Sequence, residues 1–143
     1  MTLEDNKAVV RRFIEDVFVA GREDTADELL APDFTPHTWA SVEPGTESFK
    51  HTMRRMAQTL SDVQMTIEDV IAEDDRVAVR LTSSAVPTGD FMGVAAAGKP
   101  YSIPEIHVFR VRDGRIAEHW HVADLLTMMR QLGALPEPAR RRA

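Results

Sequence analysis

The chain has 143 residues, of which 43% are hydrophobic and 28% charged, and its formal net charge is −6. This composition is typical of one soluble globular domain, expected over residues 1–143 with 137–143 as a disordered tail. The acidic balance argues against a nucleic-acid partner, and the absence of cysteine excludes disulfides, thiolate metal sites and cysteine nucleophiles. No apolar run approaches the roughly 18 residues of a membrane span, and no signal pattern is present, so we expect a cytoplasmic protein with no membrane partner.

The first thirty residues predict two helices. Thr2 and Asp5 are spaced as a capping pair for a first helix, whose apolar residues recur at helical spacing as far as Ala20. Either Asp24 or Thr25 can cap a short second helix. The first helix is amphipathic, so it should pack its apolar face on another layer.

A third helix is predicted after a loop. Residues 33–35 look extended, and residues 36–45 are rich in loop formers. Thr46 then begins a segment in which apolar residues recur every three or four positions. These residues are Phe49, Met53, Met56, Ala57 and Leu60.

The apolar period changes from helical to twofold after residue 60. Strands are predicted over residues 63–72 and 76–85, and a hairpin over 101–121, with a Gly-containing loop at 87–100. A final helix is expected over residues 123–132, with a glycine directly after it. Helices first and antiparallel strands afterwards predict an α+β domain, with the helices packed on one face of a curved sheet.

The predicted hairpin carries the residues best suited to chemistry. Three of the five histidines, His107, His119 and His121, lie on it together with Glu105. Histidine gives and takes protons near neutral pH, so its clustering beside a carboxylate points to acid–base catalysis. Whether these side chains meet depends on which strand face each occupies.

Two hairpin registers are open from the sequence. A three-residue turn with Gly114 in a bulge position pairs His107 with His119, and Glu105 with His121. One face then carries Glu105, His107, Phe109, His119 and His121. The other face carries Ile106, Val108, Arg110, Ile116, Glu118 and Trp120. A two-residue type I′ turn would instead place His107 opposite Trp120 and divide the histidines between the faces. We favour the first register because it keeps the ionisable groups together.

Three motifs and the order of elements resemble one known family. The motifs are Asn-Lys-Ala-Val-Val-Arg-Arg-Phe at 6–13, Phe-Met-Gly-Val-Ala-Ala-Ala-Gly-Lys at 91–99 and Phe-Arg-Val-Arg-Asp-Gly-Arg-Ile-Ala-Glu-His-Trp at 109–120. They resemble those of the SnoaL-like polyketide cyclases, in the nuclear-transport-factor-2-like superfamily. The resemblance implies a conical α+β fold and a cofactor-independent cyclase of antibiotic biosynthesis that closes a ring in a polyketide.

The resemblance also implies a general acid–base residue, and here the chain departs from the family. In those cyclases an aspartate follows the His-Trp pair, whereas His119 and Trp120 are followed by His121. An imidazole can still serve as a base, which makes His121 the leading catalytic candidate, with Glu105 orienting it and raising its pKa. His107 or His119 would stabilise an enolate, with bound water as an alternative donor. A second mechanism needs no ionisable catalyst, because holding a reactive polyene in a folded conformer can drive a cycloaddition-type closure.

Other residues receive expected roles as well. Asp124 is an alternative carboxylate but suits a cap of the last helix better. His51 lies on an amphipathic helix and is expected to be solvated. The candidate substrate-binding residues are His37, Trp39, Phe13, Phe34, Met53, Met56 and Phe91.

Other classes of site and partner are weighed against this hypothesis. Three imidazoles and a carboxylate also suit zinc or iron(II), but the resemblance implies no metal and no cofactor. Trp120, on the opposite face, is a candidate for a homodimer interface. The alternative functions are an epoxide-opening or hydroxylating SnoaL-like relative and a non-catalytic domain that binds small molecules.

Overall fold

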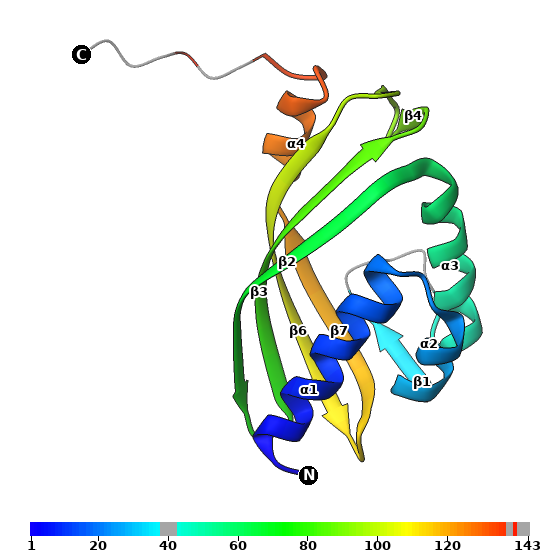
Figure 1. Ribbon diagram of the computed structural model, residues 1–143, viewed down its shortest axis with the longest axis vertical. Helices are drawn as coiled ribbons and strands as arrows, with labels where there is room; N and C mark the ends of the chain where they lie inside the picture. Colours follow the sequence, from blue (N-terminus) through cyan, green and yellow to red (C-terminus); the bar gives the residue numbers. More distant parts are fainter. Residues whose placement is uncertain (38–42, 137–138, 140–143) are drawn as a thin grey trace.

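A strongly curved sheet wraps around the first helix in the computed structural model, which describes residues 1–37, 43–136 and 139 (Figure 1). Its five strands lie in the order β1-β7-β6-β3-β2; all neighbours are antiparallel except β1 and β7. The strands are β1 (Leu30–Pro36), β2 (Leu60–Glu73), β3 (Arg76–Pro87), β6 (Tyr101–Arg112) and β7 (Arg115–Ala123). A separate small hairpin joins β4 (Asp90–Phe91) to β5 (Val94–Ala95). The predicted α+β class is confirmed, and the predicted tail falls outside the described residues except at 139.

The helices begin largely where the sequence places them. Helix α1 (Leu3–Phe13) has the capping box of Thr2 and Asp5, and a π-helix, η1 (Ile14–Val19), continues it. Helix α2 (Glu23–Leu29) has Arg22 at its cap position, so the expectation of Asp24 or Thr25 as the cap was wrong. Asp24 instead accepts a hydrogen bond from the next backbone N–H, inside the first turn.

The remaining helices agree with the sequence. Helix α3 is Thr46–Thr59, and α4 is Leu125–Gln131 with Asp124 as its N-cap. The Asp124 carboxylate accepts from the backbone N–H of Thr127, which confirms its capping role. Among the described residues, no helix combines the length and apolar character needed to cross a membrane.

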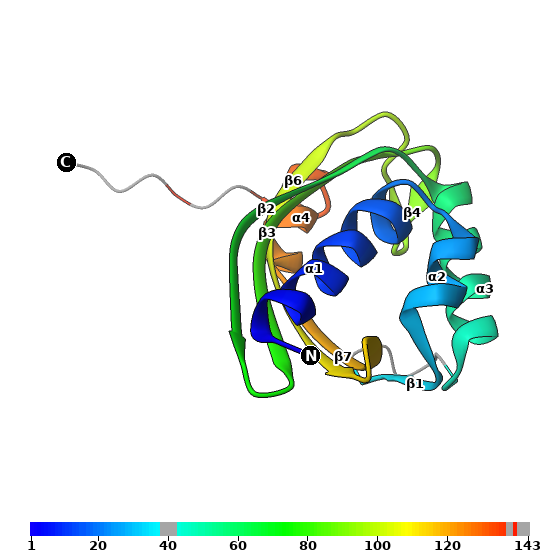
Figure 2. The same ribbon diagram turned by 60° about the horizontal axis from the view of Figure 1, so that its bottom comes forward.

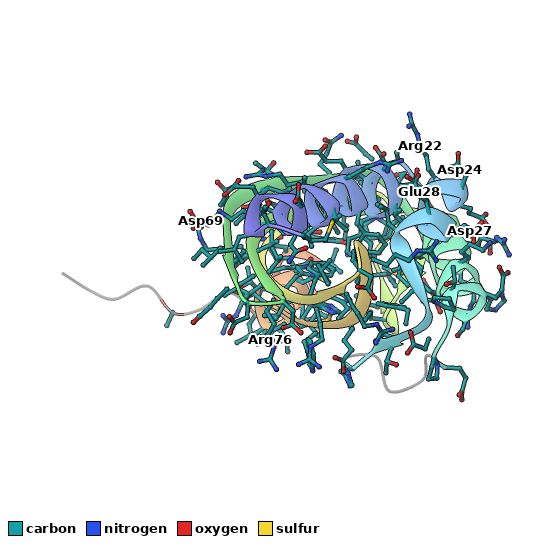
Figure 3. All side chains as sticks on the ribbon, turned by 90° about the horizontal axis from the view of Figure 1, so that it is seen from below. Arg22, Asp24, Asp27, Glu28, Asp69 and Arg76 are labelled. Atoms are coloured by element: carbon teal, nitrogen blue, oxygen red, sulfur yellow. The ribbon has the colours of Figure 1, made fainter. Side chains whose placement is uncertain are left out.

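The core lies between the concave face of the sheet and the helices that cover it (Figures 2 and 3). Phe13 and Phe34 are fully buried there, and each ring lies about 5.5 Å from that of Phe49. Figure 3 shows side chains filling this space, while the labelled charged residues of α2, and Asp69 and Arg76, lie at the periphery. Phe13 and Phe34 belong to this core, so their predicted place in a substrate pocket was wrong.

The hairpin of β6 and β7 combines features of both expected registers. Asp113 and Gly114 form a two-residue turn with φ of +51° and +74°, as a type I′ turn requires. Ala117 then bulges, because Arg110 pairs with Glu118 whereas Val111 pairs with Ile116. The bulge adds one residue to β7 and so compensates for the shorter turn. Beyond the bulge, each side chain of β7 therefore points to the same face of the sheet as a three-residue turn would predict.

The resulting pairs differ from the expected ones, although the shared face does not. His107 lies opposite His121, and His119 lies opposite Phe109. The predicted pairs His107–His119 and Glu105–His121 were therefore wrong by two residues, which leaves the facing of the side chains unchanged. Ile116, expected on the outer face, is fully buried in the core because it stands before the bulge.

Candidate active site

A cavity of about 960 Å³ opens between the inner face of the sheet and the helical layer. Its walls come from η1, α3 and α4 and from strands β2, β3, β6 and β7. Six of the predicted site residues line it, namely Glu105, His107, His121, Met53, Met56 and Phe91. Residues far apart in the sequence therefore meet where the resemblance implies a substrate pocket.

The hairpin residues form a buried chain of hydrogen bonds behind this wall. Glu105 Oε1 lies 2.8 Å from His107 Nε2, and His107 Nδ1 lies 2.8 Å from His119 Nε2. Because a carboxylate accepts, the neutral His107 ring donates from Nε2 and accepts at Nδ1, and His119 donates from Nε2. Each of these two hydrogen bonds therefore has a defined donor and a defined acceptor.

Aromatic rings keep water away from this chain. The Phe18 ring, carried by η1, lies 5.9 Å from the His107 ring and 5.8 Å from that of His119. Phe109 lies 4.6 Å from His119 and nearly parallel to it. The π-helix therefore contributes directly to the site, because it carries the residue that covers the two imidazoles.

Burial controls the protonation of the histidines. Desolvation lowers the pKa of His119 well below its ordinary value of 6.5, and the neighbouring His107 and His121 lower it further. The pKa of His121 is also lowered, by desolvation first and by His107 second, although the Glu105 charge partly opposes this. Glu105 raises the pKa of His121 as expected, but desolvation outweighs this charge and the pKa is lowered overall. The carboxylate itself bonds to His107.

The same three histidines offer the atoms that a metal ion would use. One ring nitrogen from each of His107, His119 and His121 lies within 4.8 Å of the others. His107 Nδ1 and His119 Nε2 are already joined by a hydrogen bond of 2.8 Å, with the proton on His119. An ion would have to displace that proton, so the arrangement suits proton chemistry better.

The structure places His37 away from the cavity. His37 lies on the outer face of the sheet, where its ring is nearly parallel to that of Trp120 at 4.7 Å and its Nε2 is 3.0 Å from Glu118. Its predicted place in the pocket was wrong because β1 pairs with β7, a long-range contact that sequence patterns do not reveal. Trp39 falls outside the described residues, and His51 is exposed on α3 as expected.

Tyr101 and Ser83 are polar cavity residues that were not identified from the sequence. Tyr101 and Ser83 are 7% and 4% exposed and both line the cavity. Burial, followed by the Glu105 charge, raises the pKa of Tyr101 to about 12. Their inward strand parity, shared with Glu105, was the available signal.

Comparison with known proteins agrees with the geometry. A family model, SnoaL-like polyketide cyclase, matches residues 8–132. The chain belongs to this family. As a SnoaL-like polyketide cyclase it is an enzyme, and the non-catalytic alternative loses its support.

Three similar proteins illustrate the range of this family. Aklanonic acid methyl ester cyclase AcmA from Streptomyces galilaeus is 30% identical over 98% of this chain and 99% of its own. The structure of TsrD from Streptomyces laurentii superposes with a TM-score of 0.85, at 31% identity over 94% of this chain and 99% of its own. AclR from Streptomyces galilaeus, a proposed hydroxylase, gives a TM-score of 0.81 at 25% identity over 97% and 87%.

Proposed function

We propose that this SnoaL-like cyclase closes a ring in an aromatic polyketide intermediate of antibiotic biosynthesis, without a cofactor, with His121 as the acid–base group. The observation that carries the proposal is the position of His121, which lines the cavity beside the Glu105–His107–His119 chain. The name of the relative AcmA, an aklanonic acid methyl ester cyclase, supports the methyl ester of a polyketide acid as the substrate class.

The proposed reaction needs no net gain or loss of protons. The neutral imidazole of His121 takes a proton from the carbon beside a substrate carbonyl, and the resulting carbanion attacks a second carbonyl of the same molecule. A carbon–carbon bond forms while the second carbonyl becomes an alkoxide, which receives the proton back from the imidazolium. The lowered pKa of His121 supports this role, because it keeps the resting imidazole neutral and able to accept.

The other two histidines take positional roles in this proposal. Each uses a ring N–H inside the buried chain, His107 toward Glu105 and His119 toward His107. Neither of those N–H groups is then available to a substrate oxygen. Groups other than these two N–H groups therefore have to stabilise the enolate, a role that the sequence had suggested for His107 or His119. The chain holds the two rings rigid and places a negative charge near the imidazolium that His121 becomes.

Replacement of His121 tests the catalytic assignment. With aklanonic acid methyl ester as substrate, His121→Ala should lower kcat/KM by about 10²- to 10⁴-fold, the usual contribution of a general base. His121→Asp, which introduces the residue typical of the family, should recover most of that loss. His51→Ala, an exposed histidine on α3, is the matched control and should leave kcat/KM unchanged. Retention of most activity by His121→Ala would instead favour closure by positioning alone.

A hydroxylating activity is the second candidate, favoured by the similarity to AclR. Mass spectrometry of the product separates the two functions. Ring closure of the aldol type leaves the mass unchanged, whereas hydroxylation adds one oxygen atom and needs an external oxidant and reductant. An epoxide-opening reaction would be recognised by its requirement for an epoxide substrate.

We also propose that two copies pair through the outer face of the sheet, as expected from Trp120. Ile71, Ala78, Val108 and Trp120 lie in one row across four strands. Charged residues border the row, with Arg76, Arg110 and Glu118 on one side and Asp69 and Arg80 on the other. An apolar centre with a charged rim is typical of an interface between subunits. Ile71→Asp should convert a dimer into a monomer in analytical ultracentrifugation. A cytoplasmic location remains a prediction.

A further inference from the structure

The wall of the cavity carries two hydroxyl groups that the proposed acid–base chemistry does not use. Tyr101 and Ser83 lie on adjacent strands, β6 and β3, and both face the cavity. Apart from these two and Glu105, much of the wall nearby is apolar, with Met56, Met65 and Met128 as examples. Polar groups in an apolar wall are the features that orient a ligand.

The strand register places these hydroxyls at one end of a polar line that reaches the histidines. Tyr101 and Glu105 are four residues apart on the same face of β6, which corresponds to about 13 Å along the strand. Ser83 pairs with Ile103, so its position on β3 lies midway between them. His107 and His121 continue the line beyond Glu105. The line therefore connects the two hydroxyls to the histidines along one wall of the cavity.

Both hydroxyls are able to donate to a ligand. Among the residues that the structure describes, neither hydroxyl takes part in a hydrogen bond, although buried tyrosine and serine hydroxyls normally find a partner. The phenol remains protonated throughout the range in which a neutral imidazole works, because its pKa is raised to about 12. Phe91 lies nearly parallel to the Tyr101 ring at 6.2 Å, which limits the orientation of that ring.

We propose that Tyr101 and Ser83 form a subsite that hydrogen-bonds a phenolic or carbonyl oxygen of a planar aromatic polyketide, and so determines which substrate carbon lies against His121. The identity of the reacting carbon rests on the proposed function; binding of the oxygen does not. Tyr101 and Ser83 are positioning residues in this scheme, because they contact the substrate away from the bond that forms.

Binding measurements with two matched probes test the subsite. The probes are 2,6-dihydroxyanthraquinone, which presents oxygen atoms at both ends, and anthracene, which has the same ring skeleton without oxygen. In fluorescence titrations Tyr101→Phe should weaken the dihydroxy probe by about 3- to 10-fold, the range expected for one neutral hydrogen bond, and Ser83→Ala should have a similar effect. Affinity for anthracene should change by less than about twofold, because it has no oxygen atom that could accept a hydrogen bond.

A control and a second readout keep the test specific. Ser84→Ala removes the neighbouring hydroxyl on the other face of β3 and should leave both affinities unchanged. Equal losses for the two probes in Tyr101→Phe, or no loss for either, would overturn the subsite. His121→Ala should lower turnover as strongly as the proposed function requires, yet it should retain the difference between the probes. Failure of the catalytic proposal is thereby distinguished from failure of the subsite.

Discussion

Two histidine–glutamate pairs lie on opposite faces of the same part of the sheet, in very different surroundings. On the inner face His107 meets Glu105 at 2.8 Å, with side chains 3% and 10% exposed. On the outer face His37 meets Glu118 at 3.0 Å, with side chains 37% and 25% exposed. The outer glutamate also binds Arg110, so its charge is already compensated.

The difference between the pairs comes from solvent rather than from residue type. Water and mobile ions weaken the outer contact, and such pairs contribute little to stability. The inner pair is enclosed by aromatic rings, so each hydrogen bond is stronger and the loss of a partner is costly. Burial by Phe18 and Phe109 therefore converts an ordinary pair of side chains into part of a reactive site.

Removal of one histidine from each face should give the largest contrast. His119→Ala leaves a cavity and deprives His107 Nδ1 of its donor, so the free energy of unfolding should fall by about 2–4 kcal/mol. His37→Ala should cost less than about 1 kcal/mol, since its partner is accessible to water. Denaturant unfolding followed by circular dichroism measures both. Equal costs would mean that enclosure does not distinguish the two faces.

The dependence of stability on pH should sharpen the same contrast. His119 has a lowered pKa in the folded state, so the unfolded chain binds more protons as the pH falls below about 6.5. Stability should be fully present above that value and decline below it, by up to about 1.4 kcal/mol per pH unit for one proton. His107 and His121 are the titratable neighbours of His119, and their charges lower its pKa in the same direction as desolvation does.

A side chain that cannot be protonated at position 119 separates the contribution of His119 to the pH dependence from that of the other titratable groups. His119→Asn retains an amide that can hydrogen-bond His107 but should lose most of the decline attributed to His119. His37→Asn, on the outer face, should leave the pH dependence unchanged. Unfolding curves at a series of pH values provide the measurement. An unaltered decline in His119→Asn would assign the acid sensitivity to other groups.

Neutralising the two glutamates should give the smallest effect, visible in catalysis rather than in stability. Glu105 raises the pKa of His121, so Glu105→Gln should lower that pKa further and shift the acid limb of kcat/KM to lower pH. The amide oxygen can still accept from His107, which preserves the fold. Glu118→Gln is the matched control, and its pH–rate profile should equal that of the native chain. An upward shift in Glu105→Gln would contradict the electrostatic role.

The sequence predicted those features of the site that depend on local pattern. Twofold alternation correctly gathers Glu105, His107 and His121 on one face, because strand parity is a local property. The pairing across the hairpin was wrong because a bulge at Ala117 has no clear sequence signature. His37 was misplaced because its position depends on the parallel pairing of β1 with β7, which involves residues about eighty positions apart. Ser83 was overlooked since a serine on a strand is usually unremarkable until a cavity beside it is known.

The bulge at Ala117 has a consequence for how this hairpin can change during evolution. A chain lacking Ala117 would pair Ile116 with Val111 and Glu118 with Arg110, as the present chain does. Deletion of this residue would therefore straighten the strand without exchanging the two faces of the sheet. A hairpin with Ala117 and a hairpin one residue shorter would therefore present the same histidines to the cavity.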